Sequence, residues 1–207
     1  MTQTRVTRAE RQAQTRGRLI DVAKEMFLRD GYAATSLDKV ALEAGFSKGA
    51  VYSNFAGKEE LCLAVLDVIH AEKVRGVREA FTREADLEAQ LKAFADWAHD
   101  GLGEPRWTAL EVEFGAVARH NEWVAAELVT RHREIREAIG QLIEHVVNEA
   151  GLTSRLPVAT AAAALLSLGV GLGALRSLDP DIDVGVFTDV MRALIPPSGG
   201  EAPADRA

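Results

Sequence analysis

The residues of this chain that are best suited to chemistry lie between positions 47 and 58. Ser47, Lys48 and Gly49 follow one another; lysine can donate to guanine acceptors, and serine can pair with any base. Tyr52 and Lys58 are suited to phosphate contacts, which fix a protein on DNA without reading its sequence. This pattern indicates binding to double-stranded DNA, with a plain helical hairpin carrying solvated charges as the alternative.

Two short helices around a glycine must position these side chains. Apolar residues recur at the spacing of one helix face, at Leu37, Val40, Ala41 and Ala44. Thr35 is expected to cap this helix, with Asp38 reaching back to close a capping box. Gly45 is expected to end it, and Ser47 to cap a second helix that runs to about residue 55. This is the geometry of a helix-turn-helix, whose second helix enters the major groove.

Short motifs occur here in a specific order after Phe27: Gly31-Tyr32, Thr35-Ser36-Leu37, Val40-Ala41, Ala44-Gly45-Phe46-Ser47, Gly49, Val51-Tyr52, Asn54-Phe55 and Lys58-Glu59-Glu60-Leu61. With this order and spacing, residues 15–65 resemble the tetracycline-repressor (TetR) family of bacterial transcription regulators. One departure is Asn54, where the family often has histidine; asparagine also donates and accepts hydrogen bonds.

The resemblance implies a homodimer that binds a palindromic DNA operator and responds to a small molecule in a separate domain, usually as a repressor. It also implies which residues contact DNA. They are Arg16, Thr35, Ser36, Ser47, Lys48, Gly49, Ala50, Tyr52, Asn54 and Lys58.

The whole chain is expected to be all-α, with an N-terminal three-helix DNA-binding domain and a C-terminal helical bundle for ligand binding and dimerisation. We expect a flexible basic arm at 1–12, the helix-turn-helix domain at 13–60, the ligand and dimerisation domain at 61–195, and a disordered tail at 196–207. In the body, periodicity and breaking residues predict helices near 58–81, 87–100, 105–117, 121–150, 157–178 and 183–194.

The charge distribution agrees with a DNA-binding head on an acidic body. The net charge is −7, but residues 1–60 hold ten basic and eight acidic residues and so carry +2, which leaves −9 for the rest. The extreme N-terminus is rich in arginine. It could follow the DNA backbone or enter a minor groove, or it could be a disordered tail that aids solubility.

An uncharged stretch at 159–175 is shorter than a membrane span of about 20 residues. Its glycines do not follow a strand, so they are not a dinucleotide-binding loop. Small residues permit close helix approach, and we expect this helix and the last one to form half of an intermolecular four-helix bundle. The expected interface residues are Leu165, Leu168, Gly169, Leu172, Phe187, Val190 and Met191.

Large aromatic residues gather in the middle of the sequence, where a bundle could hold an apolar ligand. Candidate ligand contacts are Phe94, Trp97, Trp107, Phe114, Trp123 and His132. For each aromatic residue, ordinary core packing is the alternative. His132 lies in an otherwise apolar seam, so it is expected to need a hydrogen-bond partner in the core or on a ligand.

The sequence gives less support to metal binding or catalysis. Asp67 with His70 and Asp96 with His99 have the i, i+3 spacing of bundle metal sites, but the further glutamates of such sites are not identifiable. We therefore expect no metal, no cofactor and no enzyme activity. The lone Cys62 and the polar N-terminus indicate a cytoplasmic protein that does not enter the membrane. The alternatives are a helical-bundle enzyme and an architectural DNA-binding protein without a ligand.

Overall fold

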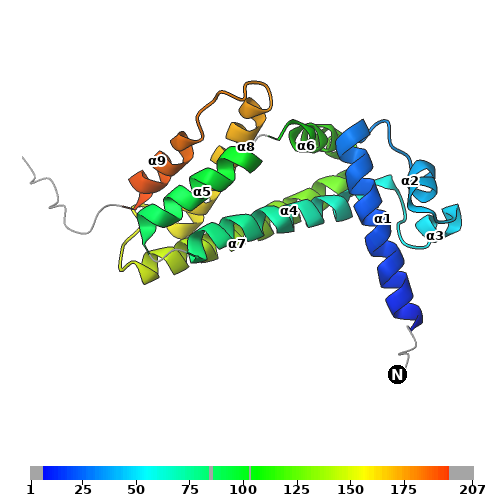
Figure 1. Cartoon of the computed structure of the whole chain (residues 1–207), viewed down its shortest axis with the longest axis horizontal. Coiled ribbons are helices and arrows are strands. Elements are labelled where there is room, and N and C mark those ends of the chain that lie inside the picture. Colours follow the sequence, from blue (N-terminus) through cyan, green and yellow to red (C-terminus); the bar gives the residue numbers. More distant parts are fainter. Residues whose placement is uncertain (1–6, 84–85, 103, 196–207) are drawn as a thin grey trace, which may run out of the picture. The chain divides into compact units, whose positions relative to one another are not determined.

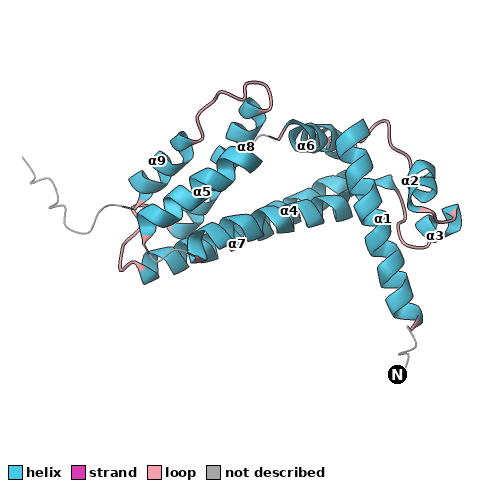
Figure 2. Ribbon diagram, in the orientation of Figure 1, coloured by secondary structure: helices cyan, strands magenta, loops and turns pink. Residues whose placement is uncertain are grey.

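The computed structural model describes residues 7–83, 86–102 and 104–195, and within them it contains helices and loops but no strand (Figure 2). The all-α fold expected from the sequence is confirmed, and the helix bounds lie close to the expected ones. In chain order the described helices are α1 (Arg8–Asp30), α2 (Leu37–Ala44), α3 (Lys48–Tyr52), α4 (Lys58–Thr82), α5 (Leu87–Gly101), α6 (Pro105–Ala118), α7 (Glu122–Glu149), α8 (Val158–Arg176) and α9 (Gly185–Leu194) (Figure 1).

The chain divides into two compact units. Residues up to Ala71 and the segment Arg106–Val129 form the N-terminal unit, while Glu72–Pro105 and the residues from Thr130 onward form the C-terminal unit. The helices α4 and α7 therefore contribute to both units. These units divide the chain differently from the expected domains at 13–60 and 61–195, because α6 and the start of α7 belong with the helix-turn-helix. The expected tail at 196–207 lies outside the described residues.

The N-terminal unit has one apolar core. The face of α1 that carries Leu19, Val22 and Phe27 packs in a single cluster with buried residues of α2, α3, α4 and α6. Gly45 has a φ of 73°, which L side chains rarely adopt, and its N–H donates to the carbonyls that end α2. This glycine lets the chain turn sharply into α3.

The capping residue of α2 is not the one expected. Ser36 is the N-cap, and its hydroxyl accepts from the backbone N–H of Lys39. Thr35 is buried, and its hydroxyl donates to the carbonyl of Gly31 at 2.9 Å. Both residues are good caps by type, but the apolar Leu37, which begins the helix, places Ser36 at the cap position. The expected capping box at Thr35 is therefore wrong.

The first helix begins earlier than expected. Thr7 caps α1 with a capping box: its hydroxyl accepts from the Glu10 N–H, and the Glu10 carboxylate accepts from the Thr7 N–H. These hydrogen bonds lower the pKa of Glu10. Residues 8–12, expected within a flexible arm, are thus the first turns of α1, while residues 1–6 lie outside the described part of the chain.

In the C-terminal unit, aromatic rings fill the core. The ring of Phe94 on α5 lies 4.9 Å from that of Phe187 on α9, 5.6 Å from Trp97 and 5.7 Å from Phe81. Leu172 and Met191 complete this cluster from α8 and α9. The three helices α5, α8 and α9 are therefore held together by one apolar core.

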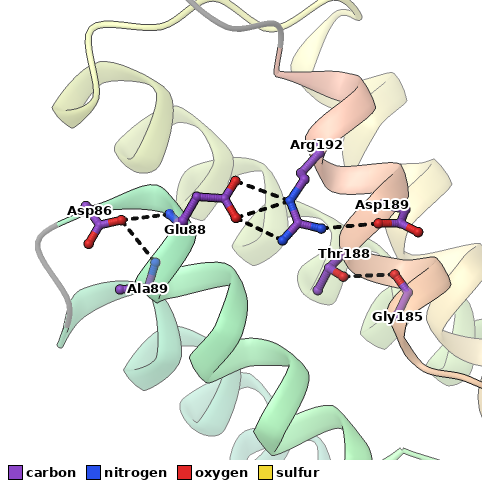
Figure 3. A network of polar contacts seen from close by, with 7 residues as sticks. All are labelled: Asp86, Glu88, Ala89, Gly185, Thr188, Asp189 and Arg192. Atoms are coloured by element: carbon purple, nitrogen blue, oxygen red, sulfur yellow. Dashed lines mark hydrogen bonds and ion pairs between the residues drawn. The ribbon is translucent and has the colours of Figure 1, made fainter.

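Polar contacts close the ends of these helices. Arg192 on α9 donates to the carboxylate of Glu88 on α5 and to Asp189, while Asp86 caps α5 (Figure 3). The buried Arg176 on α8 donates to the carbonyls of His99, Leu102 and Ile182. Two of these carbonyls belong to the C-terminal end of α5, so Arg176 satisfies groups that have no partner within their own helix.

Gly76 permits a close contact that a larger residue would disturb. A Cβ at Gly76 would lie 2.3 Å from Nε1 of Trp97, whereas a Cβ at Gly115 on α6 would meet nothing within 4 Å. Alanine gains about 1 kcal/mol of helix propensity over glycine, but overpacking costs about 1–3 kcal/mol. We expect Gly76→Ala to lower the free energy of unfolding by about 1 kcal/mol in urea titrations.

The matched control is Gly115→Ala, which should raise stability by up to about 1 kcal/mol because only the propensity gain applies. An equal gain for Gly76→Ala would contradict the close packing of α4 on Trp97.

Candidate nucleic-acid interface

The short helix α3 presents the expected DNA-contacting side chains on its outer face. Val51 is fully buried, whereas Tyr52 is 58% exposed, and Ser47, Lys48 and Gly49 also lie at the surface. The Ser47 hydroxyl accepts from the backbone N–H of Ala50 at 3.2 Å and so caps the helix. One apolar residue thus fixes α3 to the unit, while polar residues of its first turn face outward.

Lys48 forms an ion pair that the sequence did not reveal. Its ammonium lies 2.5 Å from Oδ2 of Asp38 on α2, and this hydrogen bond and charge raise the pKa of Lys48. Both side chains remain largely in contact with solvent, at 69% and 46% exposure. The pair is therefore screened and weak, and a DNA base or phosphate can replace Asp38 at little cost.

The C-terminal end of α3 is held by Arg16. This side chain donates to the backbone carbonyl of Asn54 at 2.6 Å, and its guanidinium carbon lies 4.2 Å from the centre of the Phe55 ring. The Asn54 amide donates back to the carbonyl of Ala50, while its buried Oδ1 has no hydrogen-bond partner in the described chain. Arg16 and Asn54 were expected at DNA; in this state both are engaged in fixing the turn after α3.

Lys58, another expected phosphate ligand, also points inward. Its ammonium lies 4.0 Å from the centre of the Tyr32 ring and donates to the carbonyl of Ala33 at 3.3 Å. Partial burial lowers the pKa of Lys58 from its ordinary value. The side chain holds the α1–α2 turn here, so a phosphate contact requires it to rotate outward. Of the other expected contacts, Ser36 is exposed, Ala50 is half-buried and Thr35 is buried.

A carboxylate from α6 clamps the same turn. Oε2 of Glu113 accepts from the backbone N–H groups of Tyr32 at 2.8 Å and of Ala33 at 3.2 Å. Gly31, with a φ of 87°, makes room, because a Cβ there would lie 3.1 Å from Glu113 Oε1. No local signal in the sequence indicates this contact, since the partners are about 80 residues apart. It joins α6 to the helix-turn-helix within one unit.

The six expected ligand contacts do not form one cluster. Phe94 and Trp97 belong to the core of the C-terminal unit. Trp107 and Phe114 belong to the core of the N-terminal unit, where Phe114 packs edge-on against Tyr32. Trp123 is 48% exposed. The placement of His132 in an apolar seam is corrected, because this side chain lies at the surface.

The expected dimer residues lie on two faces of α8 and α9. Leu172, Phe187 and Met191 are buried in the core of their own unit, and Leu165, Leu168, Gly169 and Val190 are half-buried. The exposed residues on the outward side are mostly small or apolar, with one charged residue, Asp189: Thr160, Ala164, Ser167, Gly171 and Leu175 on α8, with Val186, Asp189 and Ala193 on α9. Val170, which lies beside these residues, is 51% exposed, and Leu175 among them is 55% exposed.

By length and composition, α8 is also the one described helix apolar enough to cross a membrane. Core and interface helices of water-soluble proteins pass the same test, so this alone is weak evidence. Among the described residues there is no group of three or more side chains that could hold a metal ion. Cys62 is fully buried, and burial raises the pKa of its thiol.

Two family models together match most of the chain. The model described as "Bacterial regulatory proteins, tetR family" matches residues 19–65, and "BetI-type transcriptional repressor, C-terminal" matches residues 71–196. The chain belongs to the tetR family. Its members are regulators of transcription that bind DNA through a helix-turn-helix, so this TetR-family protein is a transcriptional regulator.

The curated relatives that the chain matches are also regulators of transcription. The TetR-family chain is 30% identical to the HTH-type transcriptional regulator SrpR of Pseudomonas putida, over 87% of the chain and 84% of SrpR. It is 24% identical to the regulator UidR of Escherichia coli (strain K12), over 87% of the chain and 91% of UidR. Identity to the transcriptional activator FasR of Mycolicibacterium smegmatis is 41%, but that match covers only 42% of each protein.

Solved structures share the fold. The reduced form of E. coli NemR aligns with a TM-score of 0.70 at 17% identity, covering 88% of this chain and 97% of NemR. A complex of SmeT with triclosan aligns with a TM-score of 0.66 at 18% identity, covering 93% of this chain and 96% of SmeT. At these identities the likeness shows the TetR-like fold alone.

The Glu113 clamp can be tested by substitution. Glu113→Ala leaves two amide groups of a half-buried turn without their acceptor, and hydrogen bonds to a charged group contribute about 1.5–3 kcal/mol. We expect a loss of about 2 kcal/mol in unfolding free energy, with faster hydrogen exchange at Tyr32 and Ala33. Glu113→Gln keeps one acceptor oxygen and should retain most of the protection. Unchanged exchange in Glu113→Ala would contradict the clamp.

Proposed function

We propose that this TetR-family regulator is a homodimeric repressor that binds a palindromic operator through α3, and that a small, largely apolar molecule relieves this binding. The observation that carries the proposal is the outer face of α3, where Ser47, Lys48 and Gly49 are exposed while Val51 anchors the helix. A short helix held in this way can enter a major groove without losing its packing.

The residues of α3 divide into two roles. Ser47 and Lys48 stand at its N-terminal end, which meets base edges in a helix-turn-helix, and the absence of a side chain at Gly49 allows close approach. Tyr52 and Lys58 are assigned to phosphate groups. Arg16 and Asn54 support this surface by fixing the end of α3, and Ser36 caps α2 beside it.

The outer face of α8 and α9 supports the homodimer. Small residues such as Ala164, Ser167 and Gly171 allow a second helix to approach closely, and the flanking valines and leucines supply apolar area. Two copies joined on this face carry two α3 helices. The operator is then a palindrome whose half-sites lie about 34–36 Å apart, or a multiple of that distance.

The effector is assigned to the C-terminal unit, beside Phe94 and Trp97, because the aromatic cluster there suits an apolar molecule. To release DNA, it must bind the non-DNA state more tightly than the DNA-bound state. We infer that it tilts α4, which contributes to both units, and so changes the spacing of the two α3 helices. The repressor assignment follows the matching C-terminal family, which is described as repressors. The cytoplasm, where bacterial DNA lies, is the proposed location.

The assignment of α3 can be tested by selecting duplexes from a pool with a randomised centre at a fixed salt concentration. We expect Lys48→Ala to change which base pairs are selected and to weaken binding by about 1–3 kcal/mol for each half-site, about 5- to 150-fold per half-site. Tyr52→Phe and Lys58→Ala should weaken binding to all duplexes alike, without a change in preference.

Lys92→Ala on α5 is the matched control, because Lys92 is also an exposed lysine paired with an aspartate, Asp96. It should leave binding unchanged. If Lys48→Ala kept both the affinity and the preference of the wild type, the groove assignment of α3 would be wrong.

The dimer face can be tested by ultracentrifugation at micromolar concentration. We expect the wild type to be a dimer, and Val170→Glu to weaken it at least a hundredfold, since an unpaired buried charge costs about 3–5 kcal/mol. Val112→Glu, on an exposed face of α6 at 66% exposure, introduces the same charge and should leave the dimer intact. A wild-type monomer, or a dimer insensitive to Val170→Glu, would contradict this interface.

A further inference from the structure

The first two turns of α1 extend beyond the core that the rest of the helix packs on. The first buried residue of α1 is Leu19, whereas residues 8–14 are all exposed. Residues 7–18 contain four arginines and a single acidic residue, Glu10. These two turns gain little stability from packing, which is the main source of helix stability in proteins.

The extended turns continue the core-facing stripe of α1 with polar residues. Leu19, Val22 and Met26 are buried on one side of the helix. Stepping back from Leu19 by four and three residues along the same side gives Thr15, Gln12 and Arg8, with Arg11 one helical turn from both Arg8 and Thr15. In the C-terminal part of α1 this side faces α2 and α3. In the N-terminal part of the helix the same side is basic and polar.

The Arg16 contact sets the position of these turns relative to α3. It fixes α1 against the backbone carbonyl of Asn54, at the end of α3. Arg8 lies eight residues upstream, which is about 12 Å along the helix axis. The major groove is about 12 Å wide, so the distance from Arg16 to Arg8 is comparable with the width of the groove that α3 is proposed to enter.

The capping box keeps these turns helical before any partner binds. Thr7 and Glu10 satisfy each other's backbone N–H groups, and the Glu10 carboxylate is turned to the cap. The arginines are thus presented on an ordered helix, so binding costs less conformational entropy than binding by a flexible arm.

We propose that the first two turns of α1, through Arg8 and Arg11, form a second DNA-contacting surface that binds the phosphate backbone beside the α3 groove. This inference rests on the proposed DNA-binding function and names the phosphate backbone as the partner of a further element. The contact is electrostatic, so it strengthens binding to every duplex and reads no base.

The test is the dependence of DNA affinity on salt concentration, with a duplex selected by the wild type and an unrelated duplex of the same length. Each neutralised phosphate contributes about 0.9 to the slope of log affinity against log salt. We expect R8A/R11A to reduce the slope by about 3.6 on both duplexes, because a dimer loses two phosphate contacts from each subunit, and to leave the ratio of the two affinities unchanged. The double variant R133A/R136A, which removes two exposed arginines from α7, should keep the wild-type slope.

A third variant tests the helical form of this surface. Gln12→Pro keeps both arginines but removes a helical hydrogen bond and disrupts the turn before it. We expect the slope to fall as in R8A/R11A. A full wild-type slope in Gln12→Pro would contradict the helical surface, and an unchanged slope in R8A/R11A would overturn the proposal entirely. Absence of DNA binding by the wild type would instead contradict the proposed function itself.

Discussion

The burial of Val51 and Phe55 against the core of the N-terminal unit is the interaction on which the DNA-binding surface depends. α3 has only five residues, far fewer than the roughly 12–15 that an isolated helix needs in water. Its helical form therefore comes from packing and from the Ser47 cap. Because these contacts use the inner face alone, the outer face is free to carry residues chosen for binding.

Side-chain contacts fix α3 and the α1–α2 turn to the other helices of the N-terminal unit. Gly45 sets the turn into α3, Arg16 fixes the turn out of it, and Lys58 and Glu113 hold the α1–α2 turn from α4 and α6. The helix-turn-helix is thus held by side chains from α4 and α6 as well as from α1. The unit that these contacts hold together is larger than the expected domain at 13–60.

The correct predictions of helices and turns from the sequence rest mostly on local signals. Glycines, caps and apolar spacing placed α2, the start of α3 and the turn between them correctly, because those features act over three or four residues; α3 itself ends at Tyr52 and not near residue 55. Such local signals could not predict long-range contacts. No residue near Glu113 in the sequence indicates that it accepts a hydrogen bond from Tyr32. Phe94 and Phe114 were expected in one ligand site because they are near in sequence, but they lie in different cores. The choice between Thr35 and Ser36 as cap also failed, since adjacent residues of the same type differ only in how the folded chain buries them.

The central claim is that two α3 helices of a dimer enter successive major grooves. Dimethyl sulfate modifies guanine N7, which lies in the major groove, so protection of a bound, selected duplex tests this claim most directly. We expect two protected patches, related by a palindrome, with centres about 34–36 Å apart or a multiple of that distance. Unchanged N7 reactivity in the bound duplex, or a single unsymmetrical patch, would contradict it.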